Sequence, residues 1–313
     1  MVISIIGAGA MGCRFGVAFA EAGAQVWLYD VWQEHVNQMN ANGLVVEDGV
    51  GGERTLEVNA VSDISRMPVS DVVVIFTKSM YTMDAITKAV PIIGRDTAVL
   101  TLQNGLGNIE AIREATGNNP VIAGVTNYAS DLLKPGRVEL KGSGVTKMMA
   151  LDEGARETAA RLVGLLCAVG HNAILSDDVL IDIWEKVAFN AALNTTTAIT
   201  GLTVGGGGAS LSESRQLLFD ISSEVVMVAK AEGINASESH VHGIIESVFD
   251  PEMSGDHKTS MLQDRILKRN TEIEAVCGRA VQIGKKHGLK TPKLECVYAL
   301  VRVIECNYNK ICL

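Results

Sequence analysis

The sequence lacks any concentrated positive charge. Its 27 Lys and Arg residues stand against 36 Asp and Glu residues, and five like charges never follow one another. Binding to nucleic-acid phosphates needs a basic face, so this composition argues against a nucleic-acid partner. With 47% apolar and 20% charged residues, the chain is instead typical of a folded globular protein.

The sequence also has little that predicts a membrane or secretory segment. Residues 1–12 are apolar, but no positively charged region precedes them. Residues 187–212 carry no charge, yet they include Asn190, Asn194 and the run Gly205–Gly208. This composition predicts a buried helix followed by a loop rather than a membrane span. We therefore expect a cytoplasmic protein without a membrane partner.

Metal-binding patterns are missing as well. The six cysteines show no C-x-x-C spacing and no histidine at zinc spacing. We expect no metal and reduced thiols at Cys13, Cys167, Cys277, Cys296, Cys306 and Cys312.

The first half of the chain alternates apolar strands with helices. The predicted strands are Val2–Ile6, Ala24–Tyr29, Val72–Thr77, Ala98–Leu102 and Val121–Val125. The predicted helices between them are Gly12–Ala22, Gln33–Asn42, Ser79–Val90 and Asn108–Ala115. Near-continuous apolar strands separated by helices indicate a parallel sheet covered on both faces. Residues 132–150 are expected to form less regular β structure, with a turn at Pro135–Gly136.

The second half shows helical periodicity and no convincing strand after about Leu175. The predicted helices are Glu157–Val169, Ile181–Asn194, Glu213–Glu232, Glu238–Phe249, Ser260–Lys285 and Leu294–Asn309. The predicted fold class is α/β, with an N-terminal Rossmann-type doubly wound parallel sheet and an all-α C-terminal domain. We place the dinucleotide-binding domain at residues 1–175 and a helical substrate and catalytic domain at residues 176–313, in keeping with a chain of this length.

A glycine motif follows the first predicted strand. Residues 7–12 read GAGAMG, a G-x-G-x-x-G that opens a helix. In such a motif Gly7 permits a tight turn, Gly9 lets the backbone approach a pyrophosphate, and Gly12 allows close helix packing. The start of that helix, with Ala10 and Met11, then faces the anion with free N–H groups. A glycine-rich turn without a ligand is the alternative.

Asp30 ends the second predicted strand, about 20 residues after the glycines, where an acid binds the ribose 2′-hydroxyl of NAD. Between Arg14 and Arg54 there is no Lys or Arg that would neutralise a 2′-phosphate. This arrangement favours NADH. Lys78, just after the third predicted strand, keeps NADPH as an alternative cofactor, and Asp30 as a simple turn residue is a further alternative.

A polar stripe runs along a predicted apolar helix. Lys186, Asn190 and Asn194 recur every four residues and therefore share one face. A lysine and two amides in apolar surroundings need partners or a wet cleft. A solvated polar stripe is the alternative interpretation.

Ser260 and Gln263 fit an S-x-x-Q capping box, which predicts that Ser260 begins a helix. A substrate carboxylate is a candidate ligand for that helix start, and a purely structural cap is the alternative. Glu272, on its own, would be interpreted as a surface charge.

Together these motifs resemble the ketopantoate reductase family over nearly the whole chain. The family order runs from the glycine motif through Thr77-Lys78, Gln103-Asn104-Gly105, the Lys186 helix and the segment 260–264, to Thr271-Glu272-Ile273. The resemblance implies reduction of a 2-keto acid to a D-2-hydroxy acid, with ketopantoate as the first candidate. It implies that Lys186 is the general acid and that Glu272 positions it. It further implies substrate contacts from Asn190, Asn194 and Ser260, and a place for Asn104 beside the nicotinamide.

One departure concerns the cofactor and the substrate. Asp30-Val31 occupies the region where most members carry an arginine for the NADPH phosphate, and residues 30–36 are more similar to an NADH-dependent D-mandelate-type branch. That branch, acting on bulkier 2-keto acids, is the alternative function. A 3-hydroxyacid or opine dehydrogenase and a non-catalytic NAD sensor are further alternatives. A homodimer is compatible with the sequence.

Overall fold

The computed structural model describes residues 1–49, 51–208, 211–249 and 257–309, so Cys312 lies outside the described residues. Contacts between residues divide the chain into two units. Unit 1 comprises Met1–Gln103 and Asn108–Val179, and unit 2 comprises Asn104–Gly107 and Leu180–Leu313. The expected functional division at residue 175 remains a prediction.

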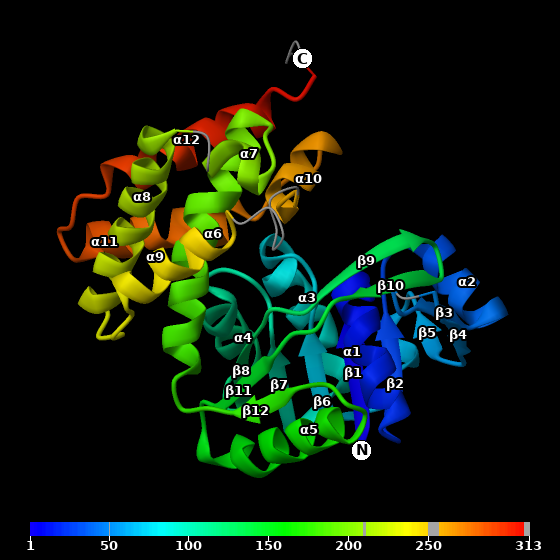
Figure 1. Cartoon of the computed structure of the whole chain (residues 1–313). Coiled ribbons are helices and arrows are strands. Elements are labelled where there is room, and N and C mark those ends of the chain that lie inside the picture. Colours follow the sequence, from blue (N-terminus) through cyan, green and yellow to red (C-terminus); the bar gives the residue numbers. More distant parts are fainter. Residues whose placement is uncertain (50, 209–210, 250–256, 310–313) are drawn as a thin grey trace. The chain divides into compact units, whose positions relative to one another are not determined.

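Unit 1 contains an eight-stranded sheet in the order β12-β11-β8-β7-β6-β1-β2-β5. The strands are β1 (Val2–Ile6), β2 (Gln25–Tyr29), β5 (Asn59–Val61), β6 (Ser70–Ile75), β7 (Ile93–Thr101), β8 (Val121–Thr126), β11 (Thr146–Ala150) and β12 (Ala173–Leu175). The neighbours pair in parallel, except that β11 runs antiparallel to β8. Strand β1 lies between β2 and β6, so the chain order reverses there, which is where open α/β sheets bind ligands (Figure 1).

Helices cover both faces of this sheet. They are α1 (Ala10–Glu21), α2 (Gln33–Asn42), α3 (Thr82–Ala89), α4 (Asn108–Thr116) and α5 (Arg156–Ala168), with a short η2 (Ser79–Tyr81) before α3. Successive residues of β6 serve opposite faces, since Val72 belongs to the core under α1 and α5 while Val73 belongs to the core under α3 and α4. Both residues are fully buried, so an apolar run forms this strand and the predicted fold class is confirmed.

A second, four-stranded sheet was not predicted as such. Its order is β4-β3-β10-β9, with β3 (Leu44–Glu47), β4 (Glu53–Leu56), β9 (Ala129–Lys134) and β10 (Arg137–Lys141). Gly136 turns the β9–β10 hairpin with a φ of 73°, at the predicted Pro135–Gly136 turn. Val45 of β3 pairs with Arg137 of β10, and this pairing joins segments that are far apart in the sequence.

Among the described residues of unit 2, helices joined by loops are the regular elements. Its elements are α6 (Val179–Thr200), α7 (Val204–Gly208), α8 (Ser212–Ala231), α9 (Glu238–Ser247), α10 (Ser260–Ile266), the π-helical turn η5 (Glu274–Gly278), α11 (Arg279–Lys286) and α12 (Pro292–Cys306). The core between them is built from apolar side chains such as Val187, Ile221 and Leu294. The glycine run predicted as a loop instead forms the one-turn helix α7, whose first N–H, from Val204, binds the carbonyl of His257 at 3.0 Å.

The single helix predicted over Ser260–Lys285 is wrong. Helix α10 ends at Ile266, because Lys268 adopts a left-handed conformation with a φ of 52°. The N–H of Lys268 then binds the Arg265 carbonyl at 3.0 Å, and that of Arg269 binds the Asp264 carbonyl at 2.9 Å. These two bonds form a Schellman helix end, which here uses lysine where glycine is usual and so gives no sequence signal.

Candidate functional site

The glycine loop at the end of β1 is held by backbone contacts. Gly7 has a φ of 100° and donates its N–H to the Tyr29 carbonyl at 2.9 Å. A Cβ on Gly7 would stand 2.8 Å from the nitrogen of Thr77, and a Cβ on Gly12 would stand 2.0 Å from the oxygen of Gly7. Only glycine fits these two positions, as the motif requires.

The middle glycine of the motif, Gly9, faces open space. A Cβ on Gly9 would meet no atom within 4 Å, and Gly9 is the N-cap of α1 without a side-chain hydrogen bond. The first turn of α1, with Ala10 and Met11, therefore has N–H groups that no capping side chain satisfies. An open approach beside such N–H groups fits the pyrophosphate of a dinucleotide.

Asp30 follows β2 directly and is partly buried. Its Oδ1 accepts a hydrogen bond from the N–H of Trp32 at 2.9 Å, which shapes the turn into α2. Lys78 precedes η2 and lies just past the end of β6. The backbone of Phe76 and Thr77, between β6 and Lys78, lies close to Gly7. The structure thus places Asp30 and Lys78 after two of the strands that flank β1.

A pocket in unit 2 brings together five residues that the sequence singled out. It is lined by residues from four segments of the chain: Asn104, Asn190, Asn194, Ser260, Met261, Asp264, Glu272 and Val276. Asn190 and Asn194 are buried in α6, while Glu272 is partly buried before η5. Amide, hydroxyl and carboxylate groups therefore face one small space, as a polar ligand requires.

Lys186 lies one turn before Asn190 on α6 and does not itself line the pocket. Its burial lowers the pKa of the ammonium to about 8, and the nearby carboxylate of Glu272 acts in the opposite direction. Desolvation disfavours the charged amine, whereas an opposite charge favours it. An amine with this pKa exchanges protons readily near neutral pH.

Ser260 is the first residue of α10 but not its cap, which corrects the predicted capping box. Thr259 is the N-cap, and its Oγ1 accepts the N–H of Leu262 at 3.3 Å. The same hydroxyl pairs with that of Thr197 at 2.7 Å, which ties α10 to α6. Ser260 lines the pocket and is an exposed residue, and the capping of α10 is done by Thr259 instead.

Two sequence comparisons bear on this arrangement. A family model described as "Ketopantoate reductase PanE/ApbA" matches residues 3–153, and "Ketopantoate reductase PanE/ApbA C terminal" matches residues 178–305. The chain belongs to the ketopantoate reductase family. The predicted resemblance is confirmed, and membership makes the chain an oxidoreductase with a Rossmann-type fold.

Similar proteins align with this chain over nearly its whole length. The 2-dehydropantoate 2-reductase of Streptococcus pyogenes is 32% identical and covers 99% of both chains. That of Lactococcus lactis is 34% identical over 96% of this chain and 97% of its own. A ternary structure of D-mandelate dehydrogenase with NADH and anilino(oxo)acetate aligns with a TM-score of 0.93 at 33% identity, over 99% of this chain and 100% of the other. A PanE/ApbA family ketopantoate reductase from Ralstonia eutropha aligns with a TM-score of 0.89 at 30% identity, over 99% of this chain and 100% of the other.

The pocket of this ketopantoate reductase family member also contains three residues that the sequence did not single out as site residues. Asp264 is buried and pairs with Arg269 at 2.9 Å, while Met261 and Val276 are buried apolar side chains. Helical spacing is the signal that was missed, because Asp264 lies four residues after Ser260 and Val276 four after Glu272.

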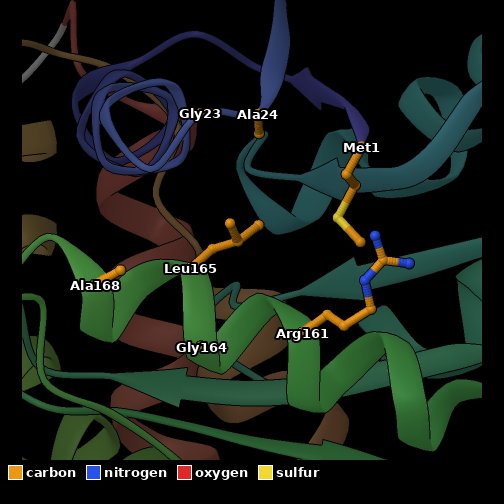
Figure 2. Close-up of a pocket in the computed structure, with 7 residues that line it drawn as sticks. All are labelled: Met1, Gly23, Ala24, Arg161, Gly164, Leu165 and Ala168. Atoms are coloured by element: carbon orange, nitrogen blue, oxygen red, sulfur yellow. The ribbon is translucent and has the colours of Figure 1, made fainter.

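A second pocket, of about 340 Å³, lies elsewhere in unit 1. Figure 2 shows its lining, with Arg161 and Leu165 of α5 opposite Met1 and the Gly23-Ala24 turn. It therefore lies at the amino ends of β1 and β2, away from the carboxyl ends where parallel sheets bind ligands.

No described group of three or more His, Cys, Asp or Glu residues is arranged to hold a metal ion. Within the same residues, no helix combines the length and the apolar character that crossing a membrane requires.

Proposed function

We propose that this chain reduces a 2-keto acid to a D-2-hydroxy acid, with 2-dehydropantoate as the substrate and NADH as the favoured cofactor. One observation carries the proposal. Five polar residues named by the family motifs line one pocket of unit 2, and the carboxylate of one of them, Glu272, acts on the pKa of Lys186. A nicotinamide nucleotide, when bound, supplies the hydride.

Lys186 is the proposed general acid. When the substrate carbonyl is reduced, negative charge develops on its oxygen, and an ammonium stabilises that charge and donates a proton. A pKa of about 8 suits both the donation and the later uptake of a proton near neutral pH. Glu272 supports this role, because its carboxylate favours the charged amine.

The neutral residues of the pocket are proposed to orient the substrate. The amides of Asn190 and Asn194 provide both donors and acceptors without altering the charge of Lys186. Ser260 lines the pocket and is exposed, and its hydroxyl is proposed to bind the substrate carboxylate. Asn104 is proposed to contact both the substrate and the nicotinamide end of the cofactor.

The cofactor proposal is based on unit 1. Gly7, Gly9 and Gly12 form the expected cradle, and Asp30 follows the adjacent strand. A 2′-phosphate beside this carboxylate would be repelled, so the site favours NADH. Lys78 provides the alternative of NADPH binding.

A substrate panel tests the proposal directly. Purified protein is assayed with 2-dehydropantoate, 2-ketoisovalerate and phenylglyoxylate, each with NADH and with NADPH. We expect the highest kcat/KM with 2-dehydropantoate and NADH. No oxidation of either nucleotide with any keto acid would refute the proposed reaction and leave a nucleotide sensor.

A second candidate function comes from the D-mandelate dehydrogenase structure. Its high TM-score and its complex with NADH and anilino(oxo)acetate favour a bulkier substrate and NADH for this chain too. In the same panel, this candidate predicts a higher kcat/KM for phenylglyoxylate than for 2-dehydropantoate. The cytoplasmic location and the homodimer remain predictions, which cell fractionation and light scattering test.

A further inference from the structure

A short glycine-rich segment, Asn104-Gly105-Leu106-Gly107, belongs to unit 2 although both of its flanks belong to unit 1. We call residues 104–107 the strap. The N–H of Leu106 donates a hydrogen bond to the carbonyl of Ala275 at 2.8 Å. Because Asn104 lines the pocket, this bond lies two residues from a group proposed to contact the substrate.

The strap binds at a π-helical turn. Ala275 lies inside η5, where hydrogen bonds span five residues instead of four, and its carbonyl also accepts a donor from outside the helix. Single π-turns of this kind occur frequently at functional sites. Val276, the next residue, lines the pocket, so the same turn contacts both the strap and the pocket.

The far side of η5 is also fixed. Glu274 accepts a hydrogen bond from the hydroxyl of Tyr298 at 2.7 Å and pairs with Arg302, both on α12. The turn is therefore anchored to a long helix, which makes it a firm support for the strap. A support of this kind fixes the position of what it binds only if the contact is close.

Gly105 provides that close contact. It has a φ of 86°, and a Cβ there would stand 2.5 Å from the Cβ and 2.9 Å from the backbone of Ala275. Gly107 has a similar φ of 96°, but its Cβ would meet the side chain of Arg279 at 2.7 Å. A side-chain end can move aside, whereas the backbone of η5 cannot. Both glycines have a positive φ, which disfavours any side chain, and they differ in what an added Cβ would contact.

We propose that the contact between Gly105, Leu106 and Ala275 is a positioning device, which holds the amide of Asn104 against the bound keto acid. The proposal rests on the proposed function. Gly105 and Ala275 act through Asn104 and are positioning residues, since neither lines the pocket. A misplacement of about 1 Å costs on the order of 10²-fold in rate, so the contact matters for turnover.

Matched alanine variants test this proposal in the full-length protein. Gly105→Ala and Gly107→Ala are compared by kcat and KM for the keto acid, by the Kd for NADH, and by Tm. We expect Gly105→Ala to lower kcat/KM for the keto acid by about 10²-fold. The Kd for NADH should rise by a smaller factor, because Asn104 is also proposed to contact the nicotinamide end of the cofactor. Gly107→Ala is expected to lose less than about tenfold, because Arg279 moves aside. Equal losses in the two variants would overturn the proposal.

A double-mutant cycle separates positioning from general disruption. If the strap acts through Asn104, then Gly105→Ala causes no further loss of kcat/KM in an Asn104→Ala background. A full additional loss there would overturn the proposal. If Gly105→Ala does not fold, Leu106→Pro, which removes the N–H donor, replaces it, with Leu106→Ala as the control that keeps the donor. Absence of keto-acid turnover by the unsubstituted protein would instead refute the proposed function, and the inference with it.

Discussion

The glycine loop of unit 1 and the pocket of unit 2 are built in different ways. The loop, residues 7–12, acts through its backbone, and Asp30 adds one side chain beside it. The pocket is made of side chains from four segments, spread from Asn104 to Val276. A backbone site depends on local conformation and is therefore visible in a contiguous motif, whereas a side-chain site depends on how distant elements pack.

We predict that the pocket of unit 2 performs the chemistry, whereas the glycine loop of unit 1 only binds the nucleotide cofactor. Lys186→Ala should lower kcat by about 10²- to 10⁴-fold, because a positioned acid is lost. The Kd for NADH, measured by fluorescence titration, should stay unchanged. Lys186→Arg is the control, since it keeps the charge but does not release a proton at working pH. Turnover retained in Lys186→Ala would remove the lysine from its role.

Substitution of Asp30 tests the proposed cofactor binding by unit 1. Asp30→Ala should reduce kcat/KM for NADH by about 10- to 100-fold, because a hydrogen bond to a charged group is lost. The value for NADPH should rise, since the repulsion of the 2′-phosphate disappears. Asp30→Asn is the matched control, because it keeps an oxygen for the N–H of Trp32 and removes only the charge. An unchanged ratio of the two cofactors in both variants would contradict the assignment.

Gly9 and Gly12 sharpen the comparison within the loop. Gly9→Ala places a Cβ in open space at a φ of −67°, so Tm should not change, while the Kd for NADH should rise about tenfold, or about 1.4 kcal/mol. Gly12→Ala drives a Cβ into the oxygen of Gly7 and should also reduce the free energy of unfolding by about 1–3 kcal/mol. Thermal denaturation and NADH titration of both variants distinguish the two roles. Normal NADH binding by Gly9→Ala would show that no ligand approaches there.

The sequence predicts five of the eight strands of the main sheet of unit 1, because their apolar runs are local signals, whereas the three-residue strands β5 and β12 were not predicted. Strand β1 and helix α2 have the expected bounds, and the other predicted strands of this sheet shift by a few residues. The pairing of Val45 with Arg137 was not predictable, since it joins segments that carry no mutual signal in the sequence. The break after Ile266 was missed because Lys268 adopts a conformation for which glycine is the usual marker.

The pocket shows the same limit more strongly. The helical spacing of Lys186, Asn190 and Asn194 predicts a shared face, but not what lies opposite it. Glu272 resembled a surface charge until the family motifs pointed to it. The support of the strap by Ala275 depends on a π-turn, and no periodicity in the sequence indicates where a helix changes from four- to five-residue hydrogen bonds.

The smallest expected effect concerns the coupling of Glu272 to Lys186. Burial lowers the pKa of Lys186 to about 8, and the Glu272 carboxylate opposes that shift. Reduction needs the ammonium form, so kcat for reduction should fall as the pH rises above about 8. Glu272→Gln removes the opposing charge, so the pKa of Lys186 should fall further. The decrease in kcat should then begin at a lower pH. Glu246→Gln is the control, since that exposed carboxylate of unit 2 pairs with Arg215 instead. If kcat falls over the same pH range in Glu272→Gln as in the unsubstituted protein, the proton comes from a group other than Lys186.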